Sequence, residues 1–373
     1  MYNVGFLVDD CVDELKVLEY EHIIAKFDRQ KLTLTILPTF DCNFKCFYCF
    51  EEKKEEKLSH KEINAIKNFT LNHIDNVKTL SVCWFGGEPL LNLEPIWELS
   101  KFFIDISEQK NVEYKAIMIS NGSLITEEIA VKLKKSNVKT IQITVDGEPN
   151  THNKRRCFID GSGTYDRVLN SIRILTKIGI KVICRINIDK TNVDGIKKLI
   201  PLLAKEKLTN FEVSFGHVLP LGTNDKWANK ICYSMKDFCS IVDVYVEMLH
   251  SYDLKIPNEY PFYPKPIKNF CGACQINSYV IHPNGDLYKC YDSLDYKVGN
   301  IFSGEATNDI YKTNYNHWIS YNPFNDEECR NCKVLPICMG GCPYLREKLG
   351  QKFCLKWKND IESVIRKKYL GSK

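Results

Sequence analysis

The sequence predicts an α/β fold whose core is a parallel sheet, built from six strand and helix repeats between about residues 31 and 216. Apolar, β-rich runs alternate with amphipathic stretches of helical periodicity, which favours parallel strands joined by helical crossovers. The apolar runs are nearly continuous, as is typical of parallel strands buried on both faces. Periodicity alone leaves open whether the sheet is doubly wound or partly closed into a barrel.

The expected elements alternate strictly along the chain. Strands are expected at 32–37, 80–85, 114–120, 140–145, 182–188 and 211–215. Helices are expected between them at 61–74, 96–106, 127–133, 165–178 and 193–205. Because the carboxyl ends of parallel strands meet at one edge of a sheet, we expect the functional groups at that edge.

Motifs follow the first four strands in register. They are the cysteine-containing loop 39–49, then Gly86-Gly87-Glu88-Pro89, Asn121-Gly122 and Asp146-Gly147. Each glycine-containing pair alone is typical of an ordinary turn. Four such motifs at successive strand ends are more than turns require, so they predict a functional site.

The pattern changes near residue 257, where four prolines in ten residues disfavour helix. We expect a short N-terminal segment at 1–30, a barrel domain at 31–256, a proline-rich linker at 257–270 and a cysteine-rich domain at 271–373 that ends in a helix. Within the last domain, Asn284-Gly285 between two apolar runs predicts a β-hairpin with a type I′ turn.

The composition excludes several classes of protein. No apolar stretch approaches the roughly 20 residues of a membrane span, and no secretory signal is present at the start of the sequence. The net charge of +4 comes without a basic stripe with interleaved aromatics, so neither a nucleic-acid nor a membrane partner is expected. Seventeen cysteines, an odd number in a long chain, indicate metal binding in the cytoplasm rather than a disulfide framework.

Three cysteines on the first strand-end loop carry the most specific signal. Cys42, Cys46 and Cys49 can hold three irons of a 4Fe-4S cube and leave the fourth iron open, and Tyr48 directly precedes the last of them. This CxxxCxxC spacing resembles the radical S-adenosylmethionine (SAM) superfamily, in which SAM chelates the open iron. The resemblance favours the partial (β/α)6 barrel over the doubly wound sheet.

The same resemblance implies the SAM-binding residues and the chemistry. The implied contacts are Tyr48, Gly86, Gly87, Glu88, Pro89, Ser120, Asn121 and Arg185. A flavodoxin or ferredoxin would supply the electron that cleaves SAM to a 5′-deoxyadenosyl radical, which abstracts a hydrogen atom. The segment 146–156 resembles the family's DG…HDxxR stretch, with Asn153 where Asp is usual; His152 and Arg156 either clamp this loop or contact substrate. No catalytic acid or base is assigned.

A second set of cysteines fills the C-terminal region. Groups of four thiolates suit iron-sulfur clusters or zinc, but the spacing resembles the SPASM domain, which has two auxiliary 4Fe-4S clusters. The resemblance places the outer cluster on Cys329, Cys332, Cys338 and Cys354, and the inner one on Cys271, Cys290 and Cys342. Cys274 is either the fourth inner ligand or a bystander that leaves an iron open. Cys83 and Cys184 are expected in the core.

The cluster loop ending Tyr48-Cys49-Phe50-Glu51 resembles enzymes that crosslink or epimerise ribosomally made precursor peptides. About thirty residues before the barrel are too few for a leader-binding winged helix, so leader binding is absent, made elsewhere on the surface or supplied by a separate protein. The alternatives are an anaerobic sulfatase-maturing enzyme, which forms formylglycine, and a non-enzymatic iron-sulfur or zinc module. Sulfatase maturases place an Asp directly after the cysteine equivalent to Cys290, where this chain has Tyr291 and then Asp292.

Overall fold

The computed structural model describes residues 8–51, 53–219, 228–257, 265–293 and 295–350, together with 352, 354, 358, 361–362 and 365–366. Residues 258–264, which form half of the expected proline-rich linker, lie outside the described residues. So do residues 1–7 of the N-terminal segment and much of the expected C-terminal helix.

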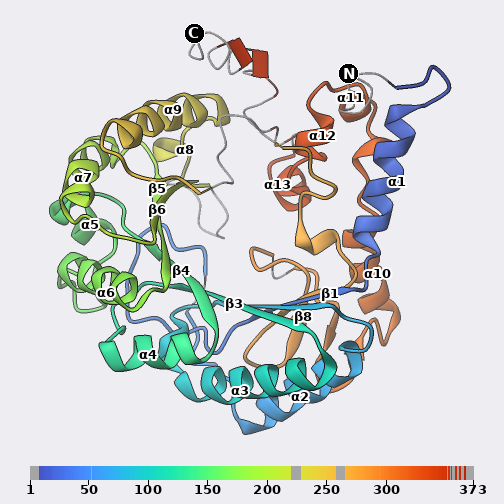
Figure 1. Cartoon of the computed structure of the whole chain (residues 1–373), viewed down its shortest axis with the longest axis horizontal. Coiled ribbons are helices and arrows are strands. Elements are labelled where there is room, and N and C mark those ends of the chain that lie inside the picture. Colours follow the sequence, from blue (N-terminus) through green and yellow to red (C-terminus); the bar gives the residue numbers. More distant parts are fainter. Residues whose placement is uncertain are drawn as a thin grey trace.

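A ten-stranded sheet in the order β10-β9-β8-β7-β1-β2-β3-β4-β5-β6 forms the centre of the molecule. The six predicted strands are β1 (Lys31–Ile36), β2 (Thr79–Trp84), β3 (Glu113–Ser120), β4 (Val138–Thr144), β5 (Lys181–Ile188) and β6 (Phe211–His217), and neighbours pair in parallel. In the described sheet β6 and β10 are free edges, so the sheet curves without closing (Figure 1). The predicted partial (β/α)6 barrel is confirmed.

Helices surround the outside of the curved sheet (Figure 1). They are α2 (His60–His73), α3 (Leu93–Lys110), α4 (Glu127–Lys135), α6 (Tyr165–Ile178) and α7 (Val193–Lys205). Ser59 and Glu62 form a capping box that starts α2. The side chain of Thr126 caps α4 by accepting a hydrogen bond from Ile129 N. Shorter elements are η2 (Pro89–Leu91), α5 (Pro149–Arg155) and α8 (Ala228–Ile231), and α9 (Met235–Ser251) follows β6.

The strands are buried on one face rather than on both, which corrects the expectation from their apolar runs. In β1, Leu32, Leu34 and Ile36 are fully buried and pack with Ile63 and Ile66 of α2. The alternate residues of β1, and those of β3 in particular, are only partly covered. The reason is that the inner face of an incompletely closed barrel lines an open interior instead of a second helical layer.

The cysteine-rich region continues the barrel sheet. Strand β7 (Ser278–Ile281) pairs in parallel with β1 and antiparallel with β8 (Asp286–Tyr288), followed by β9 (Gly299–Asn300) and β10 (Gly304–Glu305). The predicted hairpin is therefore present, but its type I′ turn is wrong. Only Gly285 of the pair has positive φ (+84°), and a hydrogen bond from Gly285 N to His282 O closes a turn over Pro283, whose ring fixes φ near −65°.

Helix α1 (Glu14–Lys26) was not predicted from the sequence and packs against this C-terminal region (Figure 1). Its His22 Nδ1 lies 2.8 Å from Lys268 O, and Lys26 Nζ donates to Tyr321 O over 2.6 Å. The remaining elements are η4 (Gly272–Cys274), α10 (Asp309–Ile319), η5 (Pro323–Asn325), α11 (Glu327–Arg330), α12 (Leu335–Cys338) and α13 (Pro343–Lys348).

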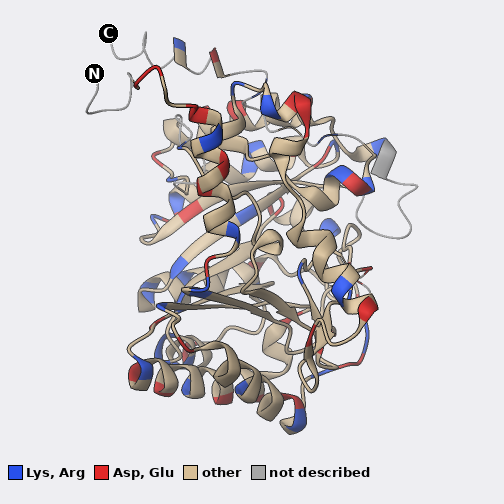
Figure 2. Cartoon of the chain, turned by 90° about the vertical axis from the view of Figure 1, so that its right-hand side faces the viewer, with Lys and Arg blue, Asp and Glu red and all other residues tan. Residues whose placement is uncertain are grey.

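Acidic and basic residues are interspersed along the helices in the view of Figure 2. Within the described part of the chain, no helix has both the length and the apolar character needed to cross a membrane.

Candidate functional site

The carboxyl ends of the barrel strands open onto a cavity of about 380 Å³. Among the residues expected to hold a cluster or SAM, those that line it are Cys42, Cys46, Tyr48, Cys49, Gly86, Gly87, Ser120, Asn121 and Arg185. Tyr291 and Asp292 from the C-terminal region line it as well. The strand-end motifs and the cysteine-rich region therefore meet at one cavity.

The loop that carries the three cysteines is held from behind. Phe44 is buried against Phe158, and Lys45 N donates to Cys157 O over 2.8 Å. Two N–H groups point at Cys42 Sγ, from Phe44 N at 3.5 Å and from Asn121 Nδ2 at 3.8 Å. Such donors stabilise a metal-bound thiolate.

Burial raises the pKa of Cys42 to about 12 and the pKa of Cys49 to about 11. These thiols therefore ionise only beside a compensating cation, which a bound metal supplies. Three soft sulfur donors on one loop, with N–H donors already aimed at one of them, fit an iron-sulfur cluster.

The two glycines of the next motif let its turn lie against the cysteine loop. A Cβ on Gly86 would lie 2.5 Å from Thr39 O, and one on Gly87 would lie 2.2 Å from Asp41 O. Gly86 also has φ +115°. The glycines are thus needed for the approach of two protein loops, and both remain exposed to the cavity that SAM would occupy.

Glu88 lies behind the cavity wall and is fully buried. Its carboxylate accepts hydrogen bonds from Ser120 Oγ at 2.9 Å, Asn121 N at 2.7 Å and Leu90 N at 3.1 Å. Burial raises the pKa of Glu88 to about 7, although these hydrogen bonds act to lower it. Glu88 therefore holds the end of β3 in place, and neither Glu88 nor Pro89 is among the residues that line the cavity.

Arg185 projects from β5 into the same cavity, and its Nε donates to Asn187 Oδ1 over 3.1 Å. A Cβ at Gly216 on the adjacent strand would lie 2.3 Å from Arg185 Nε. The glycine in β6 thus leaves the room that the guanidinium occupies.

A buried network joins the cysteine loop to the segment after β4. Tyr48 Oη donates to Asp146 Oδ2 and accepts from Arg156 Nη1 at 2.7 Å. Arg155 forms a two-pronged ion pair with Asp189 at 2.8 and 3.1 Å and lies 3.4 Å from Asp146. Tyr48 is therefore fixed by its hydroxyl at the end of the sheet.

His152 is fully buried within this segment and does not line the cavity. Its Nδ1 accepts from Asp146 N at 3.3 Å, and Nε2 faces Thr164 Oγ1 at 3.0 Å. Burial, together with the charges of Arg156 and Arg155, holds the pKa of His152 well below its usual value. Of its two interpretations, the geometry supports the neutral loop clamp.

The outer C-terminal cysteines enclose a small pocket of about 20 Å³, which all four of Cys329, Cys332, Cys338 and Cys354 line. Arg346 Nη1 lies 3.9 Å from Cys329 Sγ, and Lys358 Nζ lies 3.7 Å from Cys354 Sγ. Cationic donors at the sulfur atoms suit a site that gains negative charge on binding metal.

The inner cysteines also come together. Burial is the main cause that raises the pKa values of Cys271, Cys274 and Cys290. The charge of Cys271 further raises the pKa of Cys274 and Cys290, and the charge of Cys342 further raises the pKa of Cys271, Cys274 and Cys290. Lys26 and Lys289 are buried beside Cys274. Among the other cysteines, Cys184 is buried in β5 and Cys83 is half-buried in β2.

Comparison with known proteins identifies the domain that forms the barrel. Residues 36–203 match the family described as the radical SAM superfamily. The chain carries a radical SAM domain. The chain is an enzyme, and the radical SAM family that its barrel domain matches uses a 4Fe-4S cluster and SAM.

Similar proteins include several maturases. The Fe-coproporphyrin III synthase of Methanosarcina barkeri is 28% identical over 60% of this chain, and this match spans 53% of that protein. The cysteine-type anaerobic sulfatase-maturating enzyme of Clostridium perfringens (strain 13 / Type A) is 26% identical, covering 85% of this chain and 90% of its own. The mycofactocin maturase MftC of Mycobacterium tuberculosis (strain CDC 1551 / Oshkosh) is 23% identical, covering 86% and 81%.

Solved structures share the fold. The structure of anSMEcpe with bound AdoMet and Cp18Cys peptide has a TM-score of 0.69 at 19% identity and covers 90% of this chain and 98% of its own. Streptococcus suis SuiB bound to precursor peptide SuiA has a TM-score of 0.60 at 18% identity and covers 91% and 80%.

Sequence reasoning missed several groups in the cavity of this radical SAM enzyme. They are Glu51, Gln142, Thr144, Asn187 and His217. Thr144 and His217 are the last residues of β4 and β6, so the rule that strand ends carry function would have found them. Burial raises the pKa of Glu51 to about 7 and of Asp292 to about 6, and Asp292 adds to the shift at Glu51.

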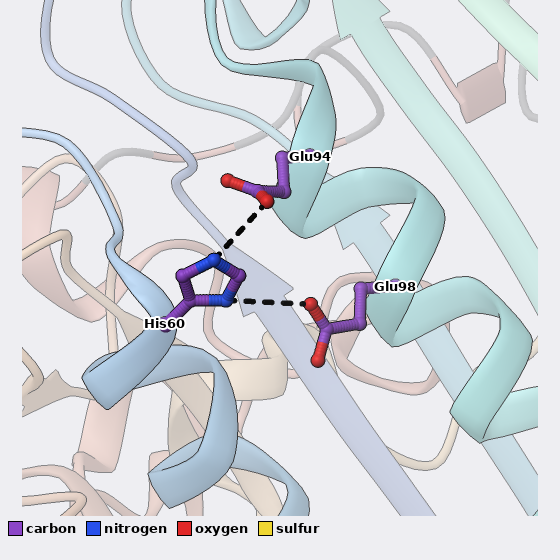
Figure 3. A group of neighbouring side chains, drawn as sticks. All are labelled: His60, Glu94 and Glu98. Carbon is purple, nitrogen blue, oxygen red and sulfur yellow. Dashed lines mark ion pairs between the residues drawn. The ribbon is translucent and has the colours of Figure 1, made fainter.

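Another group of potential metal ligands lies outside the radical SAM cavity (Figure 3). His60 at the start of α2 lies 3.3 Å from Glu94 Oε1 and 3.7 Å from Glu98 Oε2 of α3. Lys67 Nζ also pairs with Glu98 Oε1, at 2.5 Å. Because Lys67 already pairs with Glu98 and both His60 and Glu94 are exposed, this group is a set of surface contacts that joins two helices.

Proposed function

We propose that this protein is a radical SAM peptide maturase that abstracts hydrogen from a ribosomally made precursor peptide and forms a crosslink, such as a thioether, or a related modification. The observation that carries the proposal is the shared cavity, where Cys42, Cys46 and Cys49 lie with Tyr291 and Asp292 of the C-terminal region. The likeness to SuiB bound to its precursor peptide, and to the mycofactocin maturase, supports a peptide substrate.

The residues of the chain have distinct roles in this proposal. Cys42, Cys46 and Cys49 hold a 4Fe-4S cluster, which together with SAM supplies a carbon radical when both are bound. Gly86 and Gly87 present backbone at the cavity wall, and Arg185 offers a positive charge to a carboxylate. Tyr48, Ser120 and Asn121 complete the surface against which SAM is oriented. The protein thereby binds and aims its cofactor and excludes water.

The C-terminal cysteines are proposed to hold two auxiliary 4Fe-4S clusters, with Cys274 as the fourth inner ligand. Four thiolates around a cube of core charge about +2 leave a net charge of about −2. A buried ammonium group is costly unless an anion compensates it, and Lys26 and Lys289 are both buried beside Cys274. Burial lowers the pKa of both lysines, for Lys289 to about 7, so a doubly negative inner site would supply the anion that keeps them charged.

Three further proposals concern the surroundings of the enzyme. A flavodoxin or ferredoxin would supply the electron, and a separate protein would bind the leader of the precursor. Free thiols and cluster ligands persist in a reducing compartment, which favours the cytoplasm.

The first experiment measures SAM cleavage. Anaerobically reconstituted protein with dithionite should release 5′-deoxyadenosine, because the loop leaves one iron of its cube open. Replacing Cys42, Cys46 and Cys49 together with Ala should abolish this release, whereas Cys11→Ala, an exposed cysteine outside the cavity, should not. Continued cleavage by the triple variant would refute the cluster assignment.

The second experiment concerns Cys274. Iron content and Mössbauer spectra of Cys274→Ala should show loss or conversion of the inner cluster if this thiolate is a ligand, with Cys11→Ala as the control. If the bound metal is zinc instead of iron, the C-terminal cysteines form structural zinc sites and not auxiliary clusters. An unchanged spectrum would make Cys274 a bystander.

Formylglycine formation in sulfatases is the second candidate function. The sulfatase-maturating relative covers most of this chain, and Asp292 lines the cavity although it stands one position later than the Asp of those enzymes. Incubation with a sulfatase peptide containing the target Cys or Ser, followed by mass spectrometry, tests it. The non-enzymatic module is not proposed, because the chain is an enzyme that carries a radical SAM domain.

A further inference from the structure

Arg156 is the member of the DG…HNxxR segment that the proposed function does not use. Its side chain is 91% buried, since only 9% of its surface is exposed, and it lines the cavity beside the cysteine loop. Its Nη1 donates to Tyr48 Oη over 2.7 Å, and its guanidinium carbon lies 5.8 Å from the centre of the Phe44 ring. Its Nε–H has no hydrogen-bond partner among the residues that the structure describes.

The neighbouring Arg155 shows what a fully paired arginine looks like in the same segment. Arg155 donates to Asp189 through both terminal nitrogens, to Thr191 at 2.6 Å and to Asp146 at 3.4 Å. Arg156 has no carboxylate within hydrogen-bonding distance among the described side chains, although Asp146 acts on it through the shared Tyr48. A buried guanidinium with a free donor and no anion in contact requires a negative group at the cavity.

The candidates for that negative group are the loop cysteines Cys42, Cys46 and Cys49, which line the same cavity as Arg156, and the bond to Tyr48 joins Arg156 to their loop. Burial disfavours the charged form of Arg156 and lowers its pKa. Among the groups that raise the pKa of Arg156, the Cys46 thiolate has the largest effect. In turn, Arg156 is the first group that favours the thiolate form of Cys46 against burial. The free cation and one cysteine of the proposed cluster are therefore electrostatically coupled.

We propose that Arg156 is the electrostatic partner of the cluster held by Cys42, Cys46 and Cys49, and that its charge and its free N–H raise the reduction potential of that cluster. The inference rests on the proposed function, because it requires the cluster. Reduction adds one electron from the external reductant and makes the cluster more negative by one unit, with no bond formed or broken. A fixed positive charge and a free N–H at the cavity that the three cysteines line favour the more negative state.

The same free donor could otherwise serve a carboxylate of SAM or of the peptide. The two roles separate when the cluster is measured with neither SAM nor peptide present. If Arg156 only binds SAM, its replacement leaves the potential of the cluster unchanged when SAM is absent. If Arg156 only clamps the loop, there is no reason for the removal of a positive charge and the removal of a negative charge to shift the potential in opposite directions.

The experiment is redox potentiometry monitored by electron paramagnetic resonance on the full, anaerobically reconstituted protein without SAM. The signal of this cluster is the one missing from the Cys42→Ala, Cys46→Ala, Cys49→Ala triple variant. If the triple variant loses no signal, the proposed function fails. If it does lose one, the remaining variants test Arg156 alone.

Arg156→Met should lower the ratio of reduced to oxidised cluster about tenfold at a fixed potential, equivalent to about 59 mV for one electron. Arg156→Lys keeps the charge and should recover part of this loss. Asp146→Asn removes the carboxylate that offsets both arginines and should shift the potential upward. Arg173 on α6 is an exposed cation that pairs with Glu206. Arg173→Met should leave the potential unchanged.

An unchanged potential in Arg156→Met with a full cluster signal would overturn the inference. If Arg156→Met does not hold the cluster, Asp146→Asn decides, because a potential that stays the same or falls in that variant contradicts an electrostatic role. A shift in the Arg173→Met control as large as that in Arg156→Met would likewise overturn it.

Discussion

Asn153 occupies the position at which the DG…HDxxR stretch has Asp. The contacts of its side chain explain why an amide can replace the carboxylate there. Its Oδ1 accepts from Thr164 N at 2.8 Å and from Tyr165 N at 2.9 Å, at the start of α6. Thr164, the N-cap residue itself, makes no side-chain capping bond. Asn153 therefore caps α6 from a distance, and only an acceptor oxygen is required.

We expect Asn153→Ala to lower the free energy of unfolding by about 1–2 kcal/mol, because two N–H groups at a helix start lose their acceptor. Asn153→Asp should keep or slightly increase the stability, since a carboxylate accepts the same bonds and its charge favours a helix N-terminus. Denaturant unfolding under anaerobic conditions measures both. An equal loss in the two variants would show that the amide nitrogen matters instead.

Nine of the 24 residues that line the cavity were expected from the sequence to hold a cluster or SAM, but the sequence did not indicate which way each side chain points. The cysteines and strand-end motifs follow from spacing, because parallel strands bring their ends together. Glu88 was expected to contact SAM, yet it turns away to hold Ser120 and the backbone of Asn121. Local sequence does not encode that direction, because it depends on contact between the ends of β2 and β3.

The elements of the barrel could be read from periodicity and terminal signals. Helices α6 and α7 begin and end at the residues predicted, and α6 stops at Gly179, which adopts φ +86°. The β7 to β8 turn was misjudged because Pro283 competes with the Asn-Gly signal. The parallel pairing of β7 with β1 was not foreseen, because partners some 240 residues apart leave no periodic trace in either segment.

A partly buried ion pair connects α2 of the barrel to β10 of the C-terminal region. His73 Nδ1 lies 2.8 Å from Phe69 O, and Nε2 lies 3.1 Å from Glu305 Oε1. Both ring nitrogens face oxygen acceptors, which favours imidazolium. Burial opposes this charge, but the bonds to Glu305 and Phe69 outweigh burial and raise the pKa of His73, while His73 outweighs burial to lower the pKa of Glu305.

The sign of the pH dependence follows from these two shifts. The raised His73 pKa gives stability that is complete below pH 6.5 and is lost as the pH rises through the folded-state value. The lowered Glu305 pKa gives stability that is complete above pH 4.5 and is lost on acidification through its folded-state value. The pair therefore stabilises most between these two pH values.

His73→Gln should accordingly lower the free energy of unfolding by about 1 kcal/mol at pH 6 and by less at pH 9. Unfolding curves at both pH values give the comparison. His60→Gln, at the exposed start of the same helix, is the control and should have little effect at either pH. A loss for His73→Gln that does not change with pH would mean that packing against Phe69 and Tyr279, rather than charge, explains the contact.

The continuous sheet has a consequence for the protein as a whole. The sheet runs from the barrel expected at 31–256 into the cysteine-rich domain expected at 271–373, with β1 between β2 and β7. Thr33 N donates to Asn277 O at 2.8 Å and Leu37 N donates to Ile281 O at 3.0 Å. The first cluster loop leaves β1, and Cys290 lies two residues beyond β8, so one sheet sets the relative position of both cysteine regions.

We therefore expect β1 and β7 to open together. In hydrogen exchange with increasing denaturant, peptides covering 31–37 and 278–281 should lose protection at the same denaturant concentration, because each strand supplies the partner groups of the other. Ile281→Ala, at a fully buried position of β7, should cost about 2–5 kcal/mol and lower the protection of both peptides. Ile310→Ala on α10, where the side chain is 71% exposed, should change neither. Early loss of protection in 278–281 alone, with 31–37 still protected, would make the cysteine-rich region an independent folding unit whose position relative to the radical SAM cavity is not fixed by the sheet.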